Sequence, residues 1–318
     1  MTASETSARI RASVLDAIGN TPVVRLRKLP DARSADVQVK LEWYNPTGSY
    51  KERMALARIE GAEARGALRP GMRVVEYTGG STGSSLAMVC AAKGYRFTAV
   101  SSDAWAREKL LTMRAFGAEL HVLQSDGGKV TPELFPRLRA EVDRLVAEGN
   151  SFWTDQFHNA DALTGYRQIG EELLAQAGGA IDAFCGGVGT AGMLVGVSQA
   201  LEAGGSTARI VALEPASSPA LTKGQGGPHR VEGIGVGYVP PHLEHGTYDE
   251  ARAIDEEEAR EMARRLAREE GILAGTSTGL NVVAALQLAR ELGPGHTVAT
   301  VAVDTGLKYL AGDLFSER

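Results

Sequence analysis

Hydrophobic residues along the chain form short apolar runs that alternate with longer segments of helical character. Strands are predicted where the runs are short and β-branched or alternating, at 37–43, 73–77, 96–101, 119–123, 181–187, 209–215 and 297–306. Helices are predicted between them, at 84–94, 105–116 and 132–148 and around a stripe of apolar residues at 259–267. Strand and helix alternating at short intervals predict an α/β fold of mainly parallel sheets joined by crossover helices.

Three places share one arrangement, in which a predicted strand is followed by a turn of Gly, Ser and Thr and then by a helix. They are TGGSTG at 78–83, GGVGTAG at 186–192 and GTSTG at 275–279. In an open parallel sheet such turns lie at the carboxyl ends of strands, where ligands bind, and free N–H groups at helix starts suit anions. One such turn is weak evidence, but three together predict a site for a ligand with more than one anionic group.

The stretch NPTGSYKER at 45–53 adds a candidate reactive group to these turns. Asn45 and Pro46 indicate a turn, and Ser49 with Glu52 matches a capping box, so a helix is predicted to begin at Ser49. Lys51 then lies in the first turn, where the positive end of the helix dipole favours its neutral amine. A neutral amine is what Schiff-base chemistry needs. Taken alone, the stretch favours an ordinary lysine at a helix start with its head in water, and the three turns change that weighting.

Composition excludes several classes of partner. The net charge of −5 and pI of about 5.8 argue against nucleic acid or an anionic membrane as the main partner. Cys90 and Cys185 lie in separate apolar runs, which predicts two buried thiols in a reducing compartment and neither a disulfide framework nor a cysteine metal site. Residues 1–13 lack the apolar core of a signal peptide, and no apolar run has membrane-spanning length. A cytoplasmic protein without bound metal is expected.

A nicotinamide enzyme is a rival hypothesis for the middle turn. GVGTAG at 187–192 fits the GxGxxG pattern, and Glu214 closes the next strand, where a ribose-binding acid could lie. The unit stands late in the chain, no second nucleotide-binding half follows it, and Lys51 is left without a role. Glu214 is therefore expected to be an ordinary acid at a strand end.

Several polar residues in the loops are expected to have no catalytic role. His242, Glu244 and His245 follow two prolines and lack a third clear metal ligand, so exposure to solvent is predicted for them. Hydrogen-bonding surface roles are expected for His158 and His229. Arg230 either steers acidic substrates or is a solvated loop charge.

The motifs together resemble one family. GNTPVVRL, NPTGSYKER, TGGSTGSSLA, QF at 156–157, GVGTAGM, PHRVEGIGVGY, EGILAGTSTG and DTGLKYL occur in the order and rough spacing found in the cysteine synthase and cystathionine β-synthase family of pyridoxal phosphate enzymes. The resemblance covers nearly the whole chain. It implies two doubly wound lobes of the tryptophan synthase β-like type with pyridoxal 5′-phosphate in the cleft. The smaller, mobile lobe that binds the substrate carboxylate would span 44–150, and the larger cofactor-binding lobe would combine 1–43 with 151–318.

The resemblance also assigns roles to individual residues. Lys51 would hold the cofactor as a Schiff base and act as the catalytic base. The cofactor phosphate would lie on Gly189, Thr190, Ala191, Gly192 and Met193, and Ser277 would face the pyridine nitrogen. The substrate would be bound by Thr78, Gly79, Gly80, Ser81, Thr82 and Gln156, with Gly233 in the segment 232–237 along the mouth of the cleft. For Gln156, a structural role in capping the end of a strand is nearly as good an interpretation as substrate binding.

Two departures from the family pattern concern the cofactor. Ser81 stands where the family usually has an asparagine that bonds the phenolic oxygen of the cofactor, and the shorter hydroxyl puts the ring tilt and the reaction preference in doubt. Ala191 and Met193 replace a glycine and a threonine common in the phosphate loop. Because backbone N–H groups hold most of a phosphate, weaker anchoring is expected rather than none.

The implied reaction is β-replacement on an O-activated L-serine, with cysteine made from O-acetylserine and sulfide through an aminoacrylate intermediate. Its partners would be a small amino acid and a small nucleophile, and a homodimer is expected by family likeness. Ser81 raises one alternative, β-elimination of the cysteine desulfhydrase or serine dehydratase type. Condensation with homocysteine, as in cystathionine β-synthase, is a further alternative. A third hypothesis is a catalytically silent regulatory partner, against which the intact Lys51 motif argues.

Overall fold

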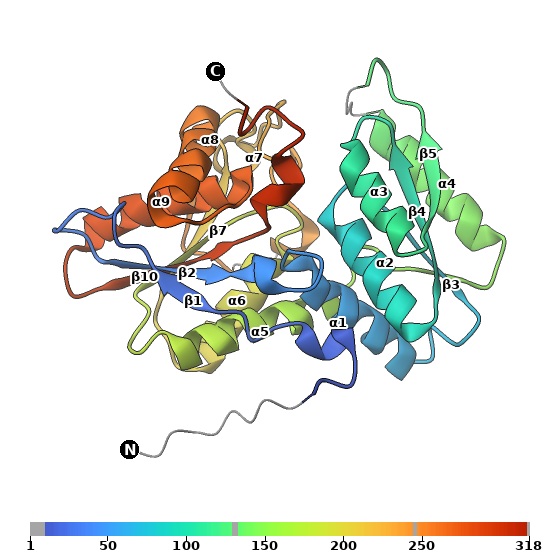
Figure 1. Cartoon of the computed structure of the whole chain (residues 1–318), viewed down its shortest axis with the longest axis horizontal. Helices are drawn as coiled ribbons and strands as arrows, with labels where there is room; N and C mark the ends of the chain where they lie inside the picture. The colour runs from blue at the N-terminus through green and yellow to red at the C-terminus, as the bar shows by residue number, and fades with distance from the viewer. Residues whose placement is uncertain (1–9, 129–132, 244–246, 317–318) are drawn as a thin grey trace.

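The computed structural model describes residues 10–128, 133–243 and 247–316 and contains two sheets (Figure 1). The six-stranded sheet has the order β1-β2-β10-β7-β8-β9, formed by β1 (Val23–Arg25), β2 (Asp36–Leu41), β7 (Ala183–Gly187), β8 (Arg209–Pro215), β9 (Glu250–Ile254) and β10 (Thr297–Ala302). The four-stranded sheet has the order β5-β4-β3-β6, formed by β3 (Arg73–Tyr77), β4 (Arg96–Ser102), β5 (Glu119–Leu123) and β6 (Ser151–Trp153). Only β1 and β2 pair antiparallel among the described strands. The predicted α/β class with mainly parallel sheets is confirmed.

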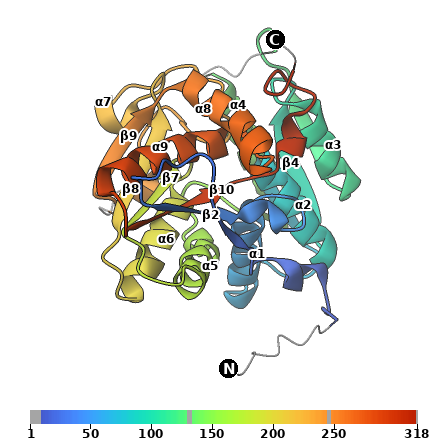
Figure 2. The same ribbon diagram turned by 60° about the vertical axis from the view of Figure 1, so that its left-hand side comes forward.

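The helices connect and cover these strands. They are α1 (Lys51–Ala64), α2 (Ser81–Lys93), α3 (Arg107–Ala115), α4 (Leu134–Ala147), α5 (Asp161–Gln176), α6 (Gly192–Ala203), α7 (Ala220–Lys223), α8 (Glu256–Arg265) and α9 (Thr276–Leu292). Both ribbon views place α5 and α6 on one face of the six-stranded sheet and α8 and α9 on the other (Figures 1 and 2). The four-stranded sheet lies with α2, α3 and α4 at the opposite end of the molecule (Figure 1).

Some predicted elements differ from the observed ones. The strand expected directly before the turn at 275–279 does not form, and Ala274 in that segment makes only an isolated bridge with Thr305. Strand β9 was not predicted because its sequence EARAI carries two charged side chains. The predicted helix at 132–148 is α4, although position 132 lies outside the described residues. The smaller lobe was expected to end at position 150. Strand β6, at 151–153, lies just beyond that position but pairs with β3 of the four-stranded sheet.

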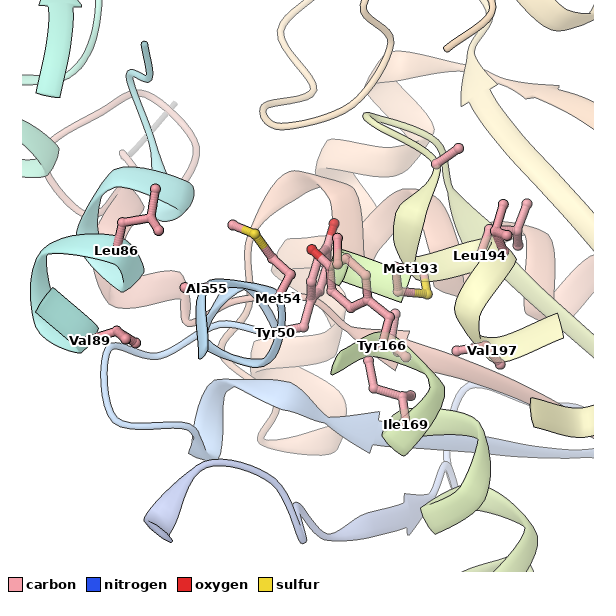
Figure 3. Close-up of a cluster of buried hydrophobic side chains, with 14 of the residues drawn as sticks. Tyr50, Met54, Ala55, Leu86, Val89, Tyr166, Ile169, Met193, Leu194 and Val197 are labelled. Atoms are coloured by element: carbon pink, nitrogen blue, oxygen red, sulfur yellow. The ribbon is translucent and has the colours of Figure 1, made fainter. Parts of the chain in front are cut away.

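One apolar core joins the helices of both halves. In Figure 3, Met54 of α1 lies between Leu86 and Val89 of α2 and the side chains of Tyr166 and Met193 from α5 and α6. These residues are all buried in the same hydrophobic cluster. Helix α1 is therefore packed between the four-stranded half and the helices under the six-stranded sheet.

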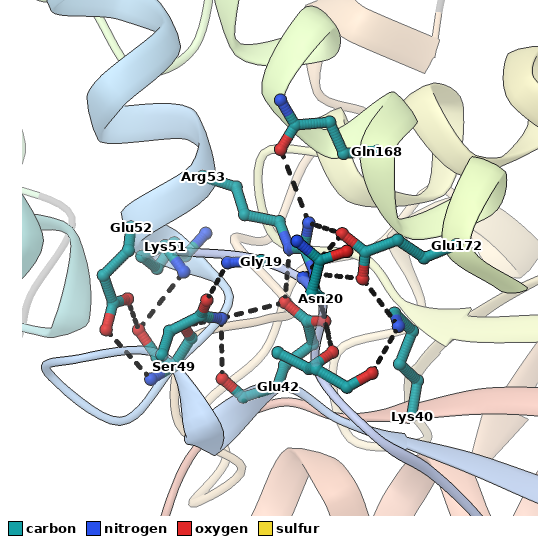
Figure 4. Close-up of polar contacts among 12 residues, drawn as sticks. Gly19, Asn20, Lys40, Glu42, Ser49, Lys51, Glu52, Arg53, Gln168 and Glu172 are labelled. Carbon is teal, nitrogen blue, oxygen red and sulfur yellow. Dashed lines mark hydrogen bonds and ion pairs between the residues drawn. The ribbon is translucent and has the colours of Figure 1, made fainter. Parts of the chain in front are cut away.

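A buried ionic network also fixes α1. Arg53 donates to Glu42 over 2.7 and 2.9 Å and to Glu172 over 2.7 and 2.8 Å, and the Arg53 and Glu42 side chains are fully buried (Figure 4). Lys40 completes the network with an ion pair to Glu172 at 2.7 Å. The network thus joins α5 and the end of β2 to Arg53, which is the third residue of α1 and lies two residues after Lys51.

Candidate active site

Lys51 is the first residue of α1, two residues later than the predicted helix start. The cap is Tyr50, whose side chain makes no capping hydrogen bond. The predicted pair of Ser49 and Glu52 nevertheless forms, because the Ser49 hydroxyl donates to Glu52 over 2.7 Å and the Lys51 N–H donates to Ser49 Oγ over 3.2 Å (Figure 4). This turn is held against the end of β10, since Tyr50 N–H donates to the carbonyl of Val303 over 3.1 Å.

The amine of Lys51 lies among aromatic rings. Its Nζ lies 4.8 Å from the centroid of the Tyr50 ring and 5.9 Å from that of Tyr166. Among the described residues it forms no hydrogen bond or ion pair. Burial, followed by repulsion from Arg58, lowers the pKa of Lys51 to about 7, against attraction from Asp304. The neutral amine was predicted, but its main cause is burial rather than the helix dipole.

Arg58 contributes to this environment because its own charge is poorly compensated. It lies two turns further along α1 and is 1 % exposed. One guanidinium N–H donates to the carbonyl of Gln156 over 2.9 Å, while Nε and Nη1 have no partner. An uncompensated buried cation acts over a longer range than a paired one.

The glycine turn at 187–192 follows β7 directly. Gly187 N–H donates to Asn281 Oδ1 over 2.8 Å, and the Asn281 amide donates to Val301 O over 2.9 Å, so α9 holds the end of β7 in place. A Cβ at Gly189 would come within 2.4 Å of the carbonyl oxygen of Gly233. Gly189 and Gly233, expected in one site, therefore lie against each other.

Ala191 occupies a position that favours glycine. It caps α6 with a φ of 67°, in the left-handed region, where a Cβ is unfavourable. Met193 is buried and faces Gly186, and Thr190 lies at the surface of the turn, partly buried. The departure at 191 is therefore a strained backbone position rather than a lost side-chain contact.

Tyr166 connects the lysine with this turn. Its ring lies beneath Lys51 Nζ, and a Cβ added at Gly192 would come within 3.1 Å of the same ring. Amine and turn thus border one aromatic side chain. A neutral amine without a partner fits the aldehyde of pyridoxal 5′-phosphate, and the N–H groups at the start of α6, which border the same ring, fit its phosphate.

The loop at 78–82 lies at the start of α2, on the other side of the site. Gly79 is required there because a Cβ would come within 1.9 Å of the Trp105 indole, whereas a Cβ at Gly80 would meet no atom within 4 Å. Thr82 Oγ1 donates to Gln156 Oε1 over 3.2 Å, and Gln156 Nε2 donates to Tyr77 O over 3.0 Å. Gln156 therefore bridges the end of β3 and the first turn of α2.

Glu76, at the end of β3, holds the segment that carries Gln156. Its buried carboxylate accepts from Thr154 Oγ1 over 2.5 Å and from Gln156 N–H over 3.0 Å. Burial raises the pKa of Glu76 to about 7 in spite of these donors. This residue was not singled out in the sequence, where it looks like one charge in an apolar run.

The third turn brings Ser277 to the start of α9. Ser277 is 1 % exposed and lies one helical turn before Asn281, which holds the end of β7. Thr276 Oγ1 accepts from Glu232 N–H over 3.1 Å. Gly235 N–H donates to Val188 O over 2.9 Å, so the segment 232–237 lies along both the second and the third turn.

Asp304 and Lys308 also lie at this site, although no role was predicted for them from the sequence. Asp304 forms a backbone bridge with Ser49, and Tyr309 donates to its Oδ2 over 3.0 Å. Lys308 donates to Ser81 Oγ over 3.1 Å. Both belong to the DTGLKYL motif, so the signal was present, but 227 positions separate Lys308 from Ser81.

The other polar candidates have local structural partners. Glu214 accepts from Leu221 N–H over 2.7 Å and from Thr222 N–H over 2.9 Å, so it caps α7. His229 makes a hydrogen bond to Gly235 O over 2.8 Å, and Arg230 pairs with Glu256 at 2.7 Å.

The prediction for His242 is wrong. It is 8 % exposed, and burial followed by repulsion from Arg58 lowers its pKa to about 4. Glu244 and His245 lie outside the described residues. His158 is exposed and pairs with Asp155 at 2.9 Å.

Comparison with known proteins identifies the class. The sequence profile of the family described as pyridoxal-phosphate dependent enzyme matches residues 14–304, and the chain belongs to this family. The chain is therefore an enzyme that depends on pyridoxal 5′-phosphate, and the nicotinamide hypothesis is wrong.

Individual relatives show which members of this family the chain is similar to. A cysteine synthase of Staphylococcus aureus is 43% identical over 306 residues, covering 96% of this chain and 97% of that protein. A crystal structure of O-ureido-L-serine synthase is 39% identical with a TM-score of 0.88, covering 96% of each chain. A cysteine synthase from Entamoeba histolytica is 31% identical with a TM-score of 0.91, covering 100% of this chain and 94% of the other. The predicted resemblance to the cysteine synthase family is confirmed.

Among the described residues, no helix is long and apolar enough to cross a membrane.

Proposed function

We propose that this enzyme catalyses β-replacement on an O-activated L-serine, making cysteine from O-acetylserine and sulfide. The observation that carries the proposal is the amine of Lys51, which has a lowered pKa and no partner and lies over the same tyrosine ring as the glycine turn of α6. The likeness to cysteine synthases supports the choice of substrate.

We assign the groups that hold pyridoxal 5′-phosphate as follows. Lys51 would bind its aldehyde carbon, and Ser277 its ring nitrogen. The phosphate would lie on the turn of Gly189, Thr190, Ala191, Gly192 and Met193 at the start of α6. When bound, the cofactor supplies an electron sink that makes the α-proton of the amino acid acidic.

The chain's own residues would then perform the remaining steps. Lys51 Nζ would take the α-proton of the substrate, a role for which a pKa of about 7 is suitable. The substrate carboxylate would bind to Thr78, Gly79, Gly80, Ser81 and Thr82, with Gln156 fixing this loop to β3.

The residues on the mouth of the cleft would exclude water. The segment 232–237 lies along the second and third turns. Lys109 of α3 forms an ion pair with Glu232 across the two halves. We propose that residues 44–150 move as a lobe against the rest and that this contact forms when the lobe closes.

The test of the proposal is Lys51→Ala. Turnover of O-acetylserine with sulfide should fall by about 10²- to 10⁴-fold or more, the usual contribution of a positioned base. The fold should persist because the amine makes no hydrogen bond or ion pair among the described residues. The matched control is Lys223→Ala, at an exposed lysine of α7, which should retain wild-type turnover. Retained turnover in Lys51→Ala would remove the assignment.

Ser81 supports a second candidate, β-elimination to pyruvate and ammonia. Its hydroxyl accepts a hydrogen bond from Lys308 over 3.1 Å, so it is already engaged by a group outside the loop. O-acetylserine supplied without a nucleophile distinguishes the two, since rapid pyruvate release would favour elimination. Cysteine formation with sulfide, and little pyruvate without it, would favour replacement. Homocysteine in place of sulfide tests the condensation seen in cystathionine β-synthases.

The remaining proposals concern assembly and location. We propose a homodimer in the cytoplasm acting on a small amino acid and a small nucleophile. Both cysteines are free and buried, and burial raises the pKa of each thiol to about 12, which suits a reducing compartment. Sedimentation at several protein concentrations tests the dimer.

A further inference from the structure

The side chain of Lys308 makes a contact between the two halves of the protein. It lies in the short helix η5 (Gly306–Tyr309), which follows β10 of the six-stranded sheet, whereas Ser81 begins α2 beside the four-stranded sheet. The Nζ of Lys308 donates to Ser81 Oγ over 3.1 Å. In both ribbon views the red C-terminal segment that contains η5 approaches the helices of the four-stranded half (Figures 1 and 2).

The charge of Lys308 is not neutralised by a neighbouring acid. Among the described residues its one hydrogen-bond partner is the neutral hydroxyl of Ser81, and no carboxylate lies within ion-pair distance. An ammonium has three donors, so two remain for another partner. Burial outweighs the attraction of Asp304 and Glu52 and, with repulsion from Lys109, lowers the pKa of Lys308.

The two nearby carboxylates, Glu52 and Asp304, accept hydrogen bonds from donors other than Lys308. Glu52 accepts from Thr47 N–H over 2.7 Å, Thr47 Oγ1 over 2.6 Å and Ser85 Oγ over 3.0 Å, besides its contact with Ser49. Asp304 accepts from Tyr309 over 3.0 Å on Oδ2, while its Oδ1 is buried without a partner.

Glu232, a third acid near Lys308, is also paired with another cation. Glu232 pairs with Lys109, and the Lys109 ammonium lies 5.2 Å from the Tyr309 ring centroid. Among the described residues, Lys308 therefore remains a largely enclosed ammonium without an ion-pair partner, so it can accept an anion from outside the protein.

Two places next to Lys308 could hold an anion, namely the loop at 78–82, which contains its partner Ser81, and a cavity of about 250 Å³ that Lys308 itself lines. Glu108, Glu232 and Asp313 line that cavity, and its other cation, Arg260, already pairs with Asp313 at 2.8 Å. Because acids outnumber cations in its lining, that cavity is the less favourable place for an anion. The loop at 78–82 has no acid and carries the open space above Gly80.

We propose that Lys308 binds the α-carboxylate of the amino-acid substrate, together with the loop at 78–82, and so determines specificity for substrates with a free carboxylate. This inference rests on the proposed function, which places the substrate carboxylate at that loop. Lys308 binds substrate and is assigned no proton transfer.

The test compares two ligands that differ only in the carboxylate. L-serine and L-serinamide are titrated into the holoenzyme, and binding is followed by the absorbance of the bound cofactor. Wild type should bind serine more tightly than serinamide. Lys308→Met should weaken serine binding by about 10- to 100-fold, the range for one hydrogen bond to a charged group, and should change serinamide binding by less than about twofold.

Two further variants make the result specific. Lys308→Arg keeps the charge and should retain serine binding within about threefold of wild type. Lys223→Met removes an exposed lysine of α7 and should leave both ligands unaffected.

Three outcomes would overturn the inference. They are equal binding of serine and serinamide by wild type, unchanged serine binding in Lys308→Met, and equal weakening of both ligands in that variant. The first needs no variant, so it holds even if Lys308→Met does not fold. Wild-type turnover of O-acetylserine with sulfide is measured in parallel, because its absence would count against the proposed function instead.

Discussion

The reactivity of Lys51 should follow an unusually low pKa, and the structure gives the size of the effect. Burial and Arg58 lower its pKa from the ordinary 10.5 to about 7. At pH 8 an amine with a pKa of about 7 is about 90% neutral, whereas an ordinary lysine is about 0.3% neutral. Since only the neutral amine attacks an aldehyde, Lys51 should react about 300-fold faster than an exposed lysine at this pH.

Removing Arg58 should raise that pKa. Arg58→Met keeps much of the side-chain length and deletes a buried charge whose Nε and Nη1 have no partner. The pKa of Lys51 should increase but remain below 10.5, because burial, the larger cause, is unchanged. The reaction profile should therefore move to higher pH.

The assay follows covalent attachment to the apoprotein. Pyridoxal 5′-phosphate is added from about pH 6 to about pH 10, and the adduct is trapped with borohydride and quantified on the peptide containing Lys51. Because the cofactor's own phosphate titrates near pH 6, pyridoxal serves as a control aldehyde without that group. Both should give a rate that increases with pH and levels off above about 7 to 8.

A rate that continues to increase up to pH 10 would refute this reasoning, since the amine would then have an ordinary pKa. An unchanged midpoint in Arg58→Met would remove Arg58 as a cause while leaving burial in place. Exposed Lys223, followed on its own peptide, provides the reference for an ordinary lysine.

Three other changes test how the site is held. Arg53→Met should lower the free energy of unfolding of the apoprotein by about 3–5 kcal/mol in urea, because the buried Glu42 loses its partner, and a second change of Glu42→Gln should recover part of the loss. An unchanged urea midpoint would contradict the network's role. Ala191→Gly should stabilise the protein by about 0.5–1 kcal/mol by relieving the positive φ, and destabilisation would show that the strain is not there. Asn281→Ala should weaken cofactor binding in equilibrium dialysis because the N–H of Gly187 loses its acceptor, whereas unchanged affinity would separate α9 from the glycine turn.

Local patterns predicted much of the fold. Strands β3, β5 and β8 have the predicted bounds because each is a compact apolar or alternating run followed by a turn. Strand β9 was missed because its sequence is too charged to indicate a strand, and it forms through its pairing with β8. The segment before α9 was predicted as a strand from its apolar residues, yet it lacks a neighbouring strand with which to pair.

The candidate site was predictable where its residues are close in sequence. Lys51 and the three glycine turns could be found because each is a local motif. The burial of His242 and the approach of Lys308 to Ser81 could not, because each depends on packing between segments far apart in the chain. Arg58 is close to Lys51 in sequence, but the burial that leaves two of its nitrogens without a partner depends on the fold as well.

The most direct test of the account is the location of the covalent bond to the cofactor. Holoenzyme saturated with pyridoxal 5′-phosphate is reduced with borohydride, digested and mapped by mass spectrometry. The account predicts one modified peptide, with the reduced adduct on Lys51. An adduct on another lysine, or none in saturated enzyme, would contradict it.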